Sequence, residues 1–326
     1  MMSKRMFALA ALSASVMTAG VAIAEDRSDW PSNFTIGTAS QGGTFFAYGT
    51  GWANFVAENL GVSGGSEITG GPMQNMALVH TGEVAFGLTT MGPARASMDG
   101  NSPLAPGLMM DNVCAVFPMY ETPFSVTALS DSGIESISDI PAGARIGFGP
   151  AGSTSDTYFP DMLETLGVDF ERRNGGWSDL GTQLQDGLLD VVAFAAGIPI
   201  PAVSQLEVQT DVNIIEFNEE ELATVLENFP VAEFMIPANT YTTLEEDARA
   251  VSMWNFAIAG CDLPEDFVYE VTKATMENND RMRSVHRSAE TTIPENIKHN
   301  TVLPFHPGAA RWYEENGYEI ADDMIN

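Results

Sequence analysis

The alternation of short apolar runs with helical stretches is the feature of this sequence that most restricts its fold. Strand-like runs over residues 33–40, 66–71 and 84–90 are separated by helical patterns over 44–60 and 73–81. Strands and helices that alternate in this way form a parallel sheet with right-handed connections. The run 84–90 is mostly apolar, as expected for a strand buried between helices. The first hundred residues therefore predict an α/β fold.

A second α/β unit follows, joined to the first by long strands. Residues 111–130 predict a strand that leaves one lobe and enters another, and residues 250–260 predict a strand that returns. A chain of 326 residues is also longer than one core usually organises. We therefore expect lobe 1 to comprise residues 25–125 and 250–326, and lobe 2 to comprise residues 126–249.

The N-terminus has the pattern of an export signal. Lys4 and Arg5 precede an apolar stretch over 6–21, and Ala22-Ile23-Ala24 offers the small-x-small pattern that a signal peptidase cleaves. The stretch is short and rich in Ser, Thr and Ala for a membrane span, although a retained anchor is the alternative. We expect residues 1–24 to be removed and the mature protein to reside in the periplasm.

The strong negative charge excludes several classes of partner. The chain carries 44 Asp and Glu against 14 Lys and Arg, a net charge of −30. Such a surface repels the phosphates of nucleic acids and of anionic lipids, so we expect neither as a partner. An anionic ligand would have to be attracted by local dipoles or by a few cations, against the field of the whole molecule.

The two cysteines, Cys114 and Cys261, lie far apart in the sequence. In an oxidising compartment they could form a disulfide that joins two distant segments. Two separate buried thiols that pack as small apolar groups are the equal alternative. Neither interpretation makes them catalytic.

Three turns between a strand and a helix carry glycines and hydroxyl side chains. They read SQGGT at 40–44, TGGP at 69–72 and GPAGSTS at 149–155. Glycines allow the backbone to approach a ligand, and N–H groups at a helix start attract an oxygen anion. Each turn alone could be an ordinary turn or a helix cap. Because ligands of open α/β sheets bind beyond the carboxyl ends of the strands, we expect the three turns to face one cleft.

The phosphate-binding motif of P-loop proteins is missing from the sequence. It contains no G-x-x-x-x-G-K-[ST], and Gly37 with Gly42-Gly43 does not make G-x-G-x-x-G. Its four histidines show no zinc-binding spacing, and His306 fits a packed residue at a helix start. We therefore expect no enzyme activity, no metal and no cofactor.

Several segments resemble one family of transport proteins. They lie at 37–55 (GTASQGGTFFAYGTGWANF), 69–90 (TGGPMQNMALVHTGEVAFGLTT), 131–156, 184–203, 263–278 and 303–317 (LPFHPGAARWYEENG). In this order they resemble the periplasmic solute-binding receptors of TAXI-type TRAP transporters. The resemblance implies the type II periplasmic-binding-protein fold, with two lobes, crossover strands and a cleft between them. It also implies a TRAP membrane subunit as partner and a glutamate, glutamine or 2-oxoglutarate-like ligand. We expect the receptor to be a monomer.

The sequence departs from the family pattern at two places. Many relatives have Gln-Ser/Thr-Asp where this chain has Thr90-Met91-Gly92, and the segment AFAAGIPIP at 193–201 is apolar. Both departures favour a smaller or less polar acid. A substrate-binding unit of an ABC importer and a histidine-kinase sensor share the fold and remain alternatives, and a periplasmic enzyme is a further one.

We expect a ligand carboxylate to rest on backbone N–H groups near Gly43 and Thr44, beside the hydroxyls of Ser40 and Thr90. We expect the site to be closed from lobe 2 by Ser153, Thr154 and Ser155. The aliphatic part of the ligand would be shielded by Phe45, Met73 and Phe194, and a polar tail would bond to Asn75. Core packing is the alternative for the two phenylalanines, and a helix face for Met73 and Asn75. The obvious carboxylate clamps, Arg95 and Arg145, are expected on the surface.

Overall fold

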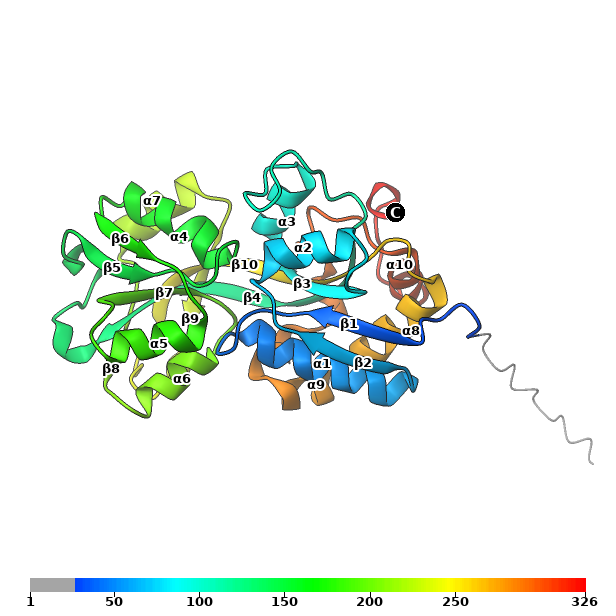
Figure 1. The fold of residues 1–326 in the computed structure, drawn as a ribbon, viewed down its shortest axis with the longest axis horizontal. Coiled ribbons are helices and arrows are strands. Elements are labelled where there is room, and N and C mark those ends of the chain that lie inside the picture. The colour runs from blue at the N-terminus through cyan, green and yellow to red at the C-terminus, as the bar shows by residue number, and fades with distance from the viewer. Residues whose placement is uncertain (1–26) are drawn as a thin grey trace, which may run out of the picture.

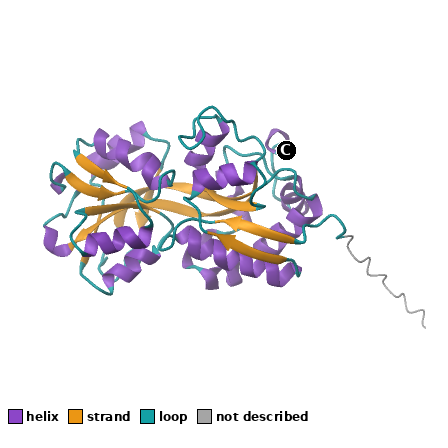
Figure 2. Cartoon of the chain, in the orientation of Figure 1, coloured by secondary structure: helices purple, strands orange, loops and turns teal. Residues whose placement is uncertain are grey.

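The computed structural model describes residues 27–326, and it shows two α/β lobes side by side (Figure 1). The predicted signal peptide lies outside the described residues. Helices cover both faces of the strands in each lobe (Figure 2). Across the described part of the chain, no helix is both long and apolar enough to cross a membrane.

Lobe 1 contains the start and the end of the chain. Its strands and helices are β1 Asn33–Gly37, α1 Thr44–Leu60, β2 Ser63–Glu67, α2 Pro72–His80, β3 Phe86–Thr90, α3 Met91–Met98, α8 Glu265–Met276, α9 Asn279–Val285 and α10 Pro307–Glu315. Three short 3-10 helices belong to the same half, η3 Arg287–Thr291, η4 Pro294–His299 and η5 Asp322–Met324.

In the sequence, lobe 2 is inserted between the two long strands β4 Cys114–Leu129 and β10 Ala248–Ala259. Its strands and helices are β5 Ala144–Gly147, α4 Thr154–Thr165, β6 Phe170–Arg173, α5 Trp177–Gln185, β7 Val191–Ala195, α6 Pro201–Glu207, β8 Val212–Ile215, α7 Glu219–Asn228 and β9 Ala232–Ile236. The 3-10 helices η1 Ser130–Ser132 and η2 Ile137–Asp139 follow β4.

One sheet runs through both lobes. Its strand order is β2-β1-β3-β10-β4-β7-β5-β6, with β8 paired to β4 and β9 to β10. The strands β1, β2 and β3 are parallel, as the alternation of strands and helices predicts, and so are β5, β6 and β7. The antiparallel pair β4 and β10 joins the two halves. The fold is therefore the predicted α/β fold with two lobes and crossover strands.

The structure differs from the predicted strands at the chain start. The second strand covers Ser63–Glu67 rather than residues 66–71. Its two glycines are poor strand formers, but the Phe34 ring fills the space beside Gly64, where a Cβ would come within 2.1 Å of Cζ. The residues 69–71 instead form the turn before α2.

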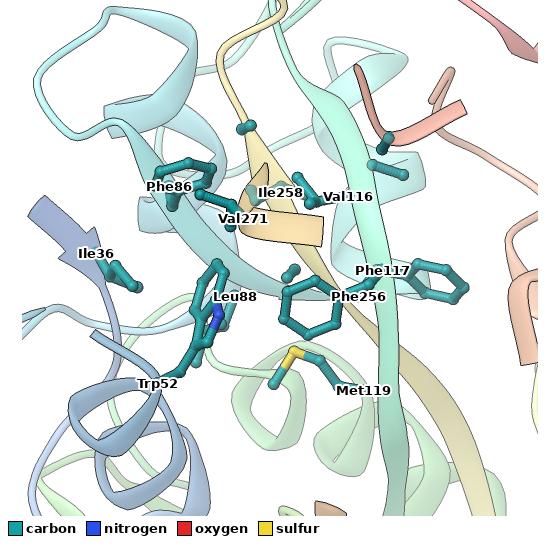
Figure 3. Close-up of a cluster of buried hydrophobic side chains, with 14 of the residues drawn as sticks. Ile36, Trp52, Phe86, Leu88, Val116, Phe117, Met119, Phe256, Ile258 and Val271 are labelled. Atoms are coloured by element: carbon teal, nitrogen blue, oxygen red, sulfur yellow. The ribbon is translucent and has the colours of Figure 1, made fainter. Parts of the chain in front are cut away.

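Each lobe has its own core. One buried cluster gathers residues from 34–120 and 256–313, and another gathers residues from 124–253. In the first, Trp52 packs edge-on against Phe86 and Phe117, with ring centroids 5.5 and 4.9 Å apart (Figure 3). Side chains from β1, β3, β4 and β10 meet there, so the two ends of the chain share one core.

A disulfide joins Cys114 to Cys261 across 147 residues of sequence. Cys114 begins β4, and Cys261 lies two residues beyond the end of β10. In the sheet, Cys114 is paired with Ala259. Of the two alternatives that the sequence left open, the structure has the bonded one. The disulfide closes the lobe 1 end of both crossover strands.

The buried His306 caps helix α10, in the packed position that the sequence indicates. Its Nδ1 accepts a hydrogen bond from the Gly308 N–H at 3.1 Å, and its Nε2 lies 3.1 Å from the Leu263 carbonyl oxygen. Burial lowers the pKa of His306 to about 4, from 6.5. The unfolded chain therefore binds a proton at this residue more readily than the folded protein does.

We expect His306 to make the protein acid-sensitive. The contribution of neutral His306 to the free energy of unfolding is fully present above pH 6.5. It is lost as the pH falls towards 4, because protonation favours the unfolded chain, and the loss reaches about 3 kcal/mol. In His306→Asn, which retains a capping side chain, urea unfolding between pH 4 and 8 should show a flatter stability profile. An identical slope in both proteins would contradict this role.

Candidate ligand-binding site

A small cavity lies between the lobes, at the carboxyl ends of strands from both. Its volume is about 30 Å³, measured to the centre of a water-sized sphere. The lining residues are Ala39, Gly43, Thr44, Phe45, Gly70, Gly71, Pro72, Thr90, Thr122, Pro150, Ser153, Thr154, Trp177, Ala195 and Ala196. All three glycine-bearing turns contribute to this list, so the structure brings them together around one space.

The first turn presents an uncapped helix to the cavity. Gly43 is the N-cap of α1, and no side chain caps the N–H groups that follow it. The first N–H groups of a helix have no partner within the helix and carry its positive dipole end. Because Thr44 and Phe45 line the cavity, this helix start can hold a carboxylate or another oxygen anion.

The second turn brings another helix start to the cavity without a side-chain cap. Gly71, the N-cap of α2, has φ +107°, which favours glycine, and Pro72 follows in the first turn of the helix. Gly70, Gly71 and Pro72 all line the cavity. Two helices of lobe 1 thus begin at one side of the same space.

The third turn is held in shape by a buried carboxylate. Asp156, in the first turn of α4, accepts a hydrogen bond from the Gly152 N–H at 2.9 Å and contacts from Arg172 and Asn174. Ser153 caps α4 by accepting from the Asp156 N–H at 3.2 Å and donates to the Phe148 carbonyl oxygen. Asp156 therefore positions the residues of lobe 2 that line the cavity.

Trp177 is a lining residue that the sequence interpretation missed. Its ring stacks on Phe194, with centroids 4.8 Å apart, and lies between glycines of both lobes. A Cβ on Gly43 would come within 2.7 Å of Cδ1 and 3.2 Å of Nε1, and one on Gly149 within 2.5 Å of Cζ2. Within the described chain, the indole N–H has no hydrogen-bond partner. The only local signal is an aromatic residue after Gly175-Gly176 at a helix start.

Asn255, on crossover strand β10, was also missed. It is fully buried, and its Oδ1 accepts from the Thr90 hydroxyl at 2.8 Å and lies 3.0 Å from the Thr122 hydroxyl. Thr154 of lobe 2 in turn donates to Thr90 at 2.8 Å. The hydroxyls of lobe 1, lobe 2 and a crossover strand therefore form one hydrogen-bonded chain at the cavity.

The structure brings about half of the predicted site residues to the cavity, namely Gly43, Thr44, Phe45, Thr90, Ser153 and Thr154. The hydroxyls among them already have protein partners; Thr44, for example, donates to the Gly197 carbonyl oxygen of lobe 2. These hydrogen bonds of the hydroxyl side chains link the two lobes or hold the turns in place. Backbone N–H groups and the indole N–H of Trp177 are therefore the donors left for a ligand.

The other predicted residues are used inside the protein and do not line the cavity. Asn75 accepts from Thr69 at 2.7 Å and donates to the carbonyl oxygens of Thr38 and Leu88. The Ser40 hydroxyl accepts from the backbone N–H of Trp177 at 3.3 Å, and the Ser155 hydroxyl donates to the Ala193 carbonyl oxygen. Met73 is buried in α2, and Phe194 stacks behind Trp177.

Backbone hydrogen bonds also cross directly between the lobes. The Ser178 N–H donates to the Gln41 carbonyl oxygen at 3.2 Å, and the Ala202 N–H donates to that of Gly42 at 2.9 Å. Both acceptors belong to the first glycine turn. The turn that presents α1 to the cavity is thus also a contact between the lobes, and the conformation is a closed one.

The two candidate arginine clamps lie away from the cavity. Arg95 donates to the Thr301 carbonyl oxygen, and its side chain is 55% exposed. Arg145 pairs with Asp190 at 2.7 Å, and this hydrogen-bonded pair lowers the pKa of the Asp190 carboxyl. In the described residues no group of His, Cys, Asp and Glu side chains could hold a metal ion.

A larger cavity, of about 190 Å³, lies near the crossover strands. Glu121 of β4 lines it, whereas the next residue, Thr122, lines the smaller cavity. Successive side chains of a strand point to opposite faces, so the two cavities lie on opposite faces of β4. Burial raises the pKa of Glu121. The smaller cavity is the candidate binding site, because the three turns converge there.

The fold matches solved structures of periplasmic binding proteins. MatC from Rhodopseudomonas palustris with bound malate aligns with a TM-score of 0.60 at 15% identity, covering 87% of this chain and 99% of that one. The binding protein BugD gives 0.57 at 14% identity, covering 88% and 97%. A Rhodopseudomonas palustris structure with adipate gives 0.55 at 15% identity, covering 84% and 98%. The class is therefore the type II periplasmic-binding-protein fold.

A family model places the chain more closely. The model of the NMT1-like family matches residues 36–317, which include both lobes and both crossover strands. The chain belongs to this family.

Proposed function

We propose that the protein is a periplasmic solute-binding receptor that captures a small carboxylate and delivers it to a TRAP-type membrane transporter. The observation that carries this proposal is the uncapped start of α1 at a closed cavity between two lobes. The malate and adipate of the two matched structures are carboxylates as well. The sequence resemblance to TAXI-type receptors supports the TRAP partner.

The proposed mechanism is capture by closure. The carboxylate binds the N–H groups at the start of α1, and the residues of lobe 2 that begin α4 and α5 close over it. A ligand that touches both lobes stabilises the closed state by the difference between its affinities for the two states. The transporter then recognises the closed receptor.

X-ray scattering in solution tests this mechanism. With saturating ligand, identified beforehand by mass spectrometry of the molecule that co-purifies, we expect a smaller radius of gyration than for the ligand-free protein. Identical curves would contradict closure as the signal. A gene for an ATPase beside this one, in place of a large membrane subunit, would instead favour the substrate-binding unit of an ABC importer.

A further inference from the structure

None of the described residues that line the cavity is ionisable. They are small or apolar residues, threonine and serine hydroxyls, and the indole of Trp177. Positive polarity comes from the uncapped backbone N–H groups at the start of α1. At α2, Pro72 has no N–H and the Met73 N–H donates to the Gly152 carbonyl oxygen at 3.4 Å, and α4 is capped by Ser153. The site therefore offers partners for one anionic group, at the start of α1.

A second charge on the ligand would have no partner there. A buried carboxylate or ammonium without a compensating group is strongly disfavoured. The protein's net charge of −30 further disfavours a dianion. The lining thus discriminates against dicarboxylates and against amino acids, whose ammonium group would be buried without a charged partner.

The indole N–H of Trp177 is the side-chain donor that remains available. The hydroxyls of Thr44, Thr90 and Thr154 donate to Gly197, Asn255 and Thr90 respectively. The Nε1 edge of Trp177 lies against Gly43, at the uncapped start of α1. It is therefore next to the backbone N–H groups that would hold a carboxylate.

The size of the cavity limits the ligand body. A volume of about 30 Å³, measured to the centre of a water-sized sphere, leaves room for a ligand of only a few non-hydrogen atoms. The surrounding alanines, prolines and Phe45 suit a short apolar or weakly polar chain.

We propose that the ligand is a short-chain monocarboxylate of about two to four carbons, and that Trp177 donates a hydrogen bond to its carboxylate. This inference rests on the proposed solute-binding function and narrows it. Glutamate and 2-oxoglutarate, which the family resemblance implies, each carry a second carboxylate and fall outside the class.

Matched three-carbon probes test the charge requirement. Isothermal titration calorimetry of the full mature protein, stripped of ligand by mild denaturation and refolding, would compare propionate, malonate, L-alanine and propionamide, with glutamate and 2-oxoglutarate titrated alongside. We expect propionate to bind at least about 100-fold more tightly than malonate or L-alanine, because each of these buries an unpaired charge. The neutral propionamide should also bind more weakly than propionate.

The outcomes separate the inference from the function on which it rests. If malonate or L-alanine binds as tightly as propionate, the monocarboxylate class is wrong. If only glutamate or 2-oxoglutarate binds, the class is wrong and the solute-binding function stands. If no carboxylate binds, both fall.

The substitution Trp177→Phe tests the proposed donor, because it keeps an aromatic ring and removes the N–H. We expect propionate affinity to fall by about 10- to 100-fold, with the affinity for propionamide changed less, since the lost bond is to a charged group. Trp312→Phe, a buried tryptophan of α10, is the matched control and should bind as the wild type does. Wild-type propionate affinity in Trp177→Phe would overturn the role of Trp177.

Discussion

The substitution Gly43→Ala is expected to weaken ligand binding by about 100-fold, or about 3 kcal/mol. The backbone of Gly43 has φ −92° and ψ 154°, which alanine adopts without strain. The effect is therefore steric. The new Cβ would lie 2.7 Å from Cδ1 of Trp177, which is closer than two carbon atoms can approach.

Trp177 cannot retreat from this methyl group. Its opposite edge lies against Gly149, and Phe194 stacks on its face. The clash must then push the lobes apart at the turn 40–44, where the hydrogen bonds from Ser178 and Ala202 cross. Binding by calorimetry and the radius of gyration by scattering should both report the loss of closure.

Gly65→Ala is the matched control for this experiment. Gly65 lies in β2 of the same lobe, and nothing lies within 4 Å of a Cβ built on it. It should bind ligand as the wild type does. Wild-type affinity in Gly43→Ala would show that the contact between Trp177 and the first turn is unimportant for closure.

Removal of the disulfide, by Cys114→Ala together with Cys261→Ala, is expected to lower the free energy of unfolding by about 2–5 kcal/mol. The bond closes a loop of 147 residues that contains all of lobe 2, so its loss greatly increases the freedom of the unfolded chain. Urea unfolding of the two proteins measures the difference.

Reductant provides the control for the disulfide prediction. Dithiothreitol should destabilise the wild type by a similar amount and leave the double alanine variant unchanged. Equal stability of the two proteins without reductant would contradict the prediction. Ligand affinity should change little, because both cysteines lie away from the cavity lining.

Local sequence signals predicted the helices well where their ends are marked. Helix α1 follows Gly43 and ends at Gly61, which has φ +68°. Strand β6 (FERR) is largely exposed and polar, and strand β9 (AEFMI) is largely exposed although most of its residues are apolar, and the prediction lacked both.

The candidate site was predicted only in part, because residue type does not reveal the partner of a polar group. Asn75 and Ser155 have side chains suited to a ligand, yet their hydrogen bonds are made with the protein. Trp177 lies against Gly43, and Asn255 accepts from the lining residue Thr90. Both contacts span more than 100 residues of sequence. Glycines before helices can be found in a sequence, whereas such long-range pairs require the fold.

The pairing of the two crossover strands determines how the lobes can move. Strands β4 and β10 lie side by side, paired from Val251 to Ala259 and bonded together at their lobe 1 end by the disulfide. A two-stranded ribbon of this kind resists bending within its own plane but yields to bending out of that plane and to torsion about its length. Sliding of the lobes past one another within the plane of the sheet is then disfavoured, and their relative motion is limited to hinge bending and twist about the ribbon.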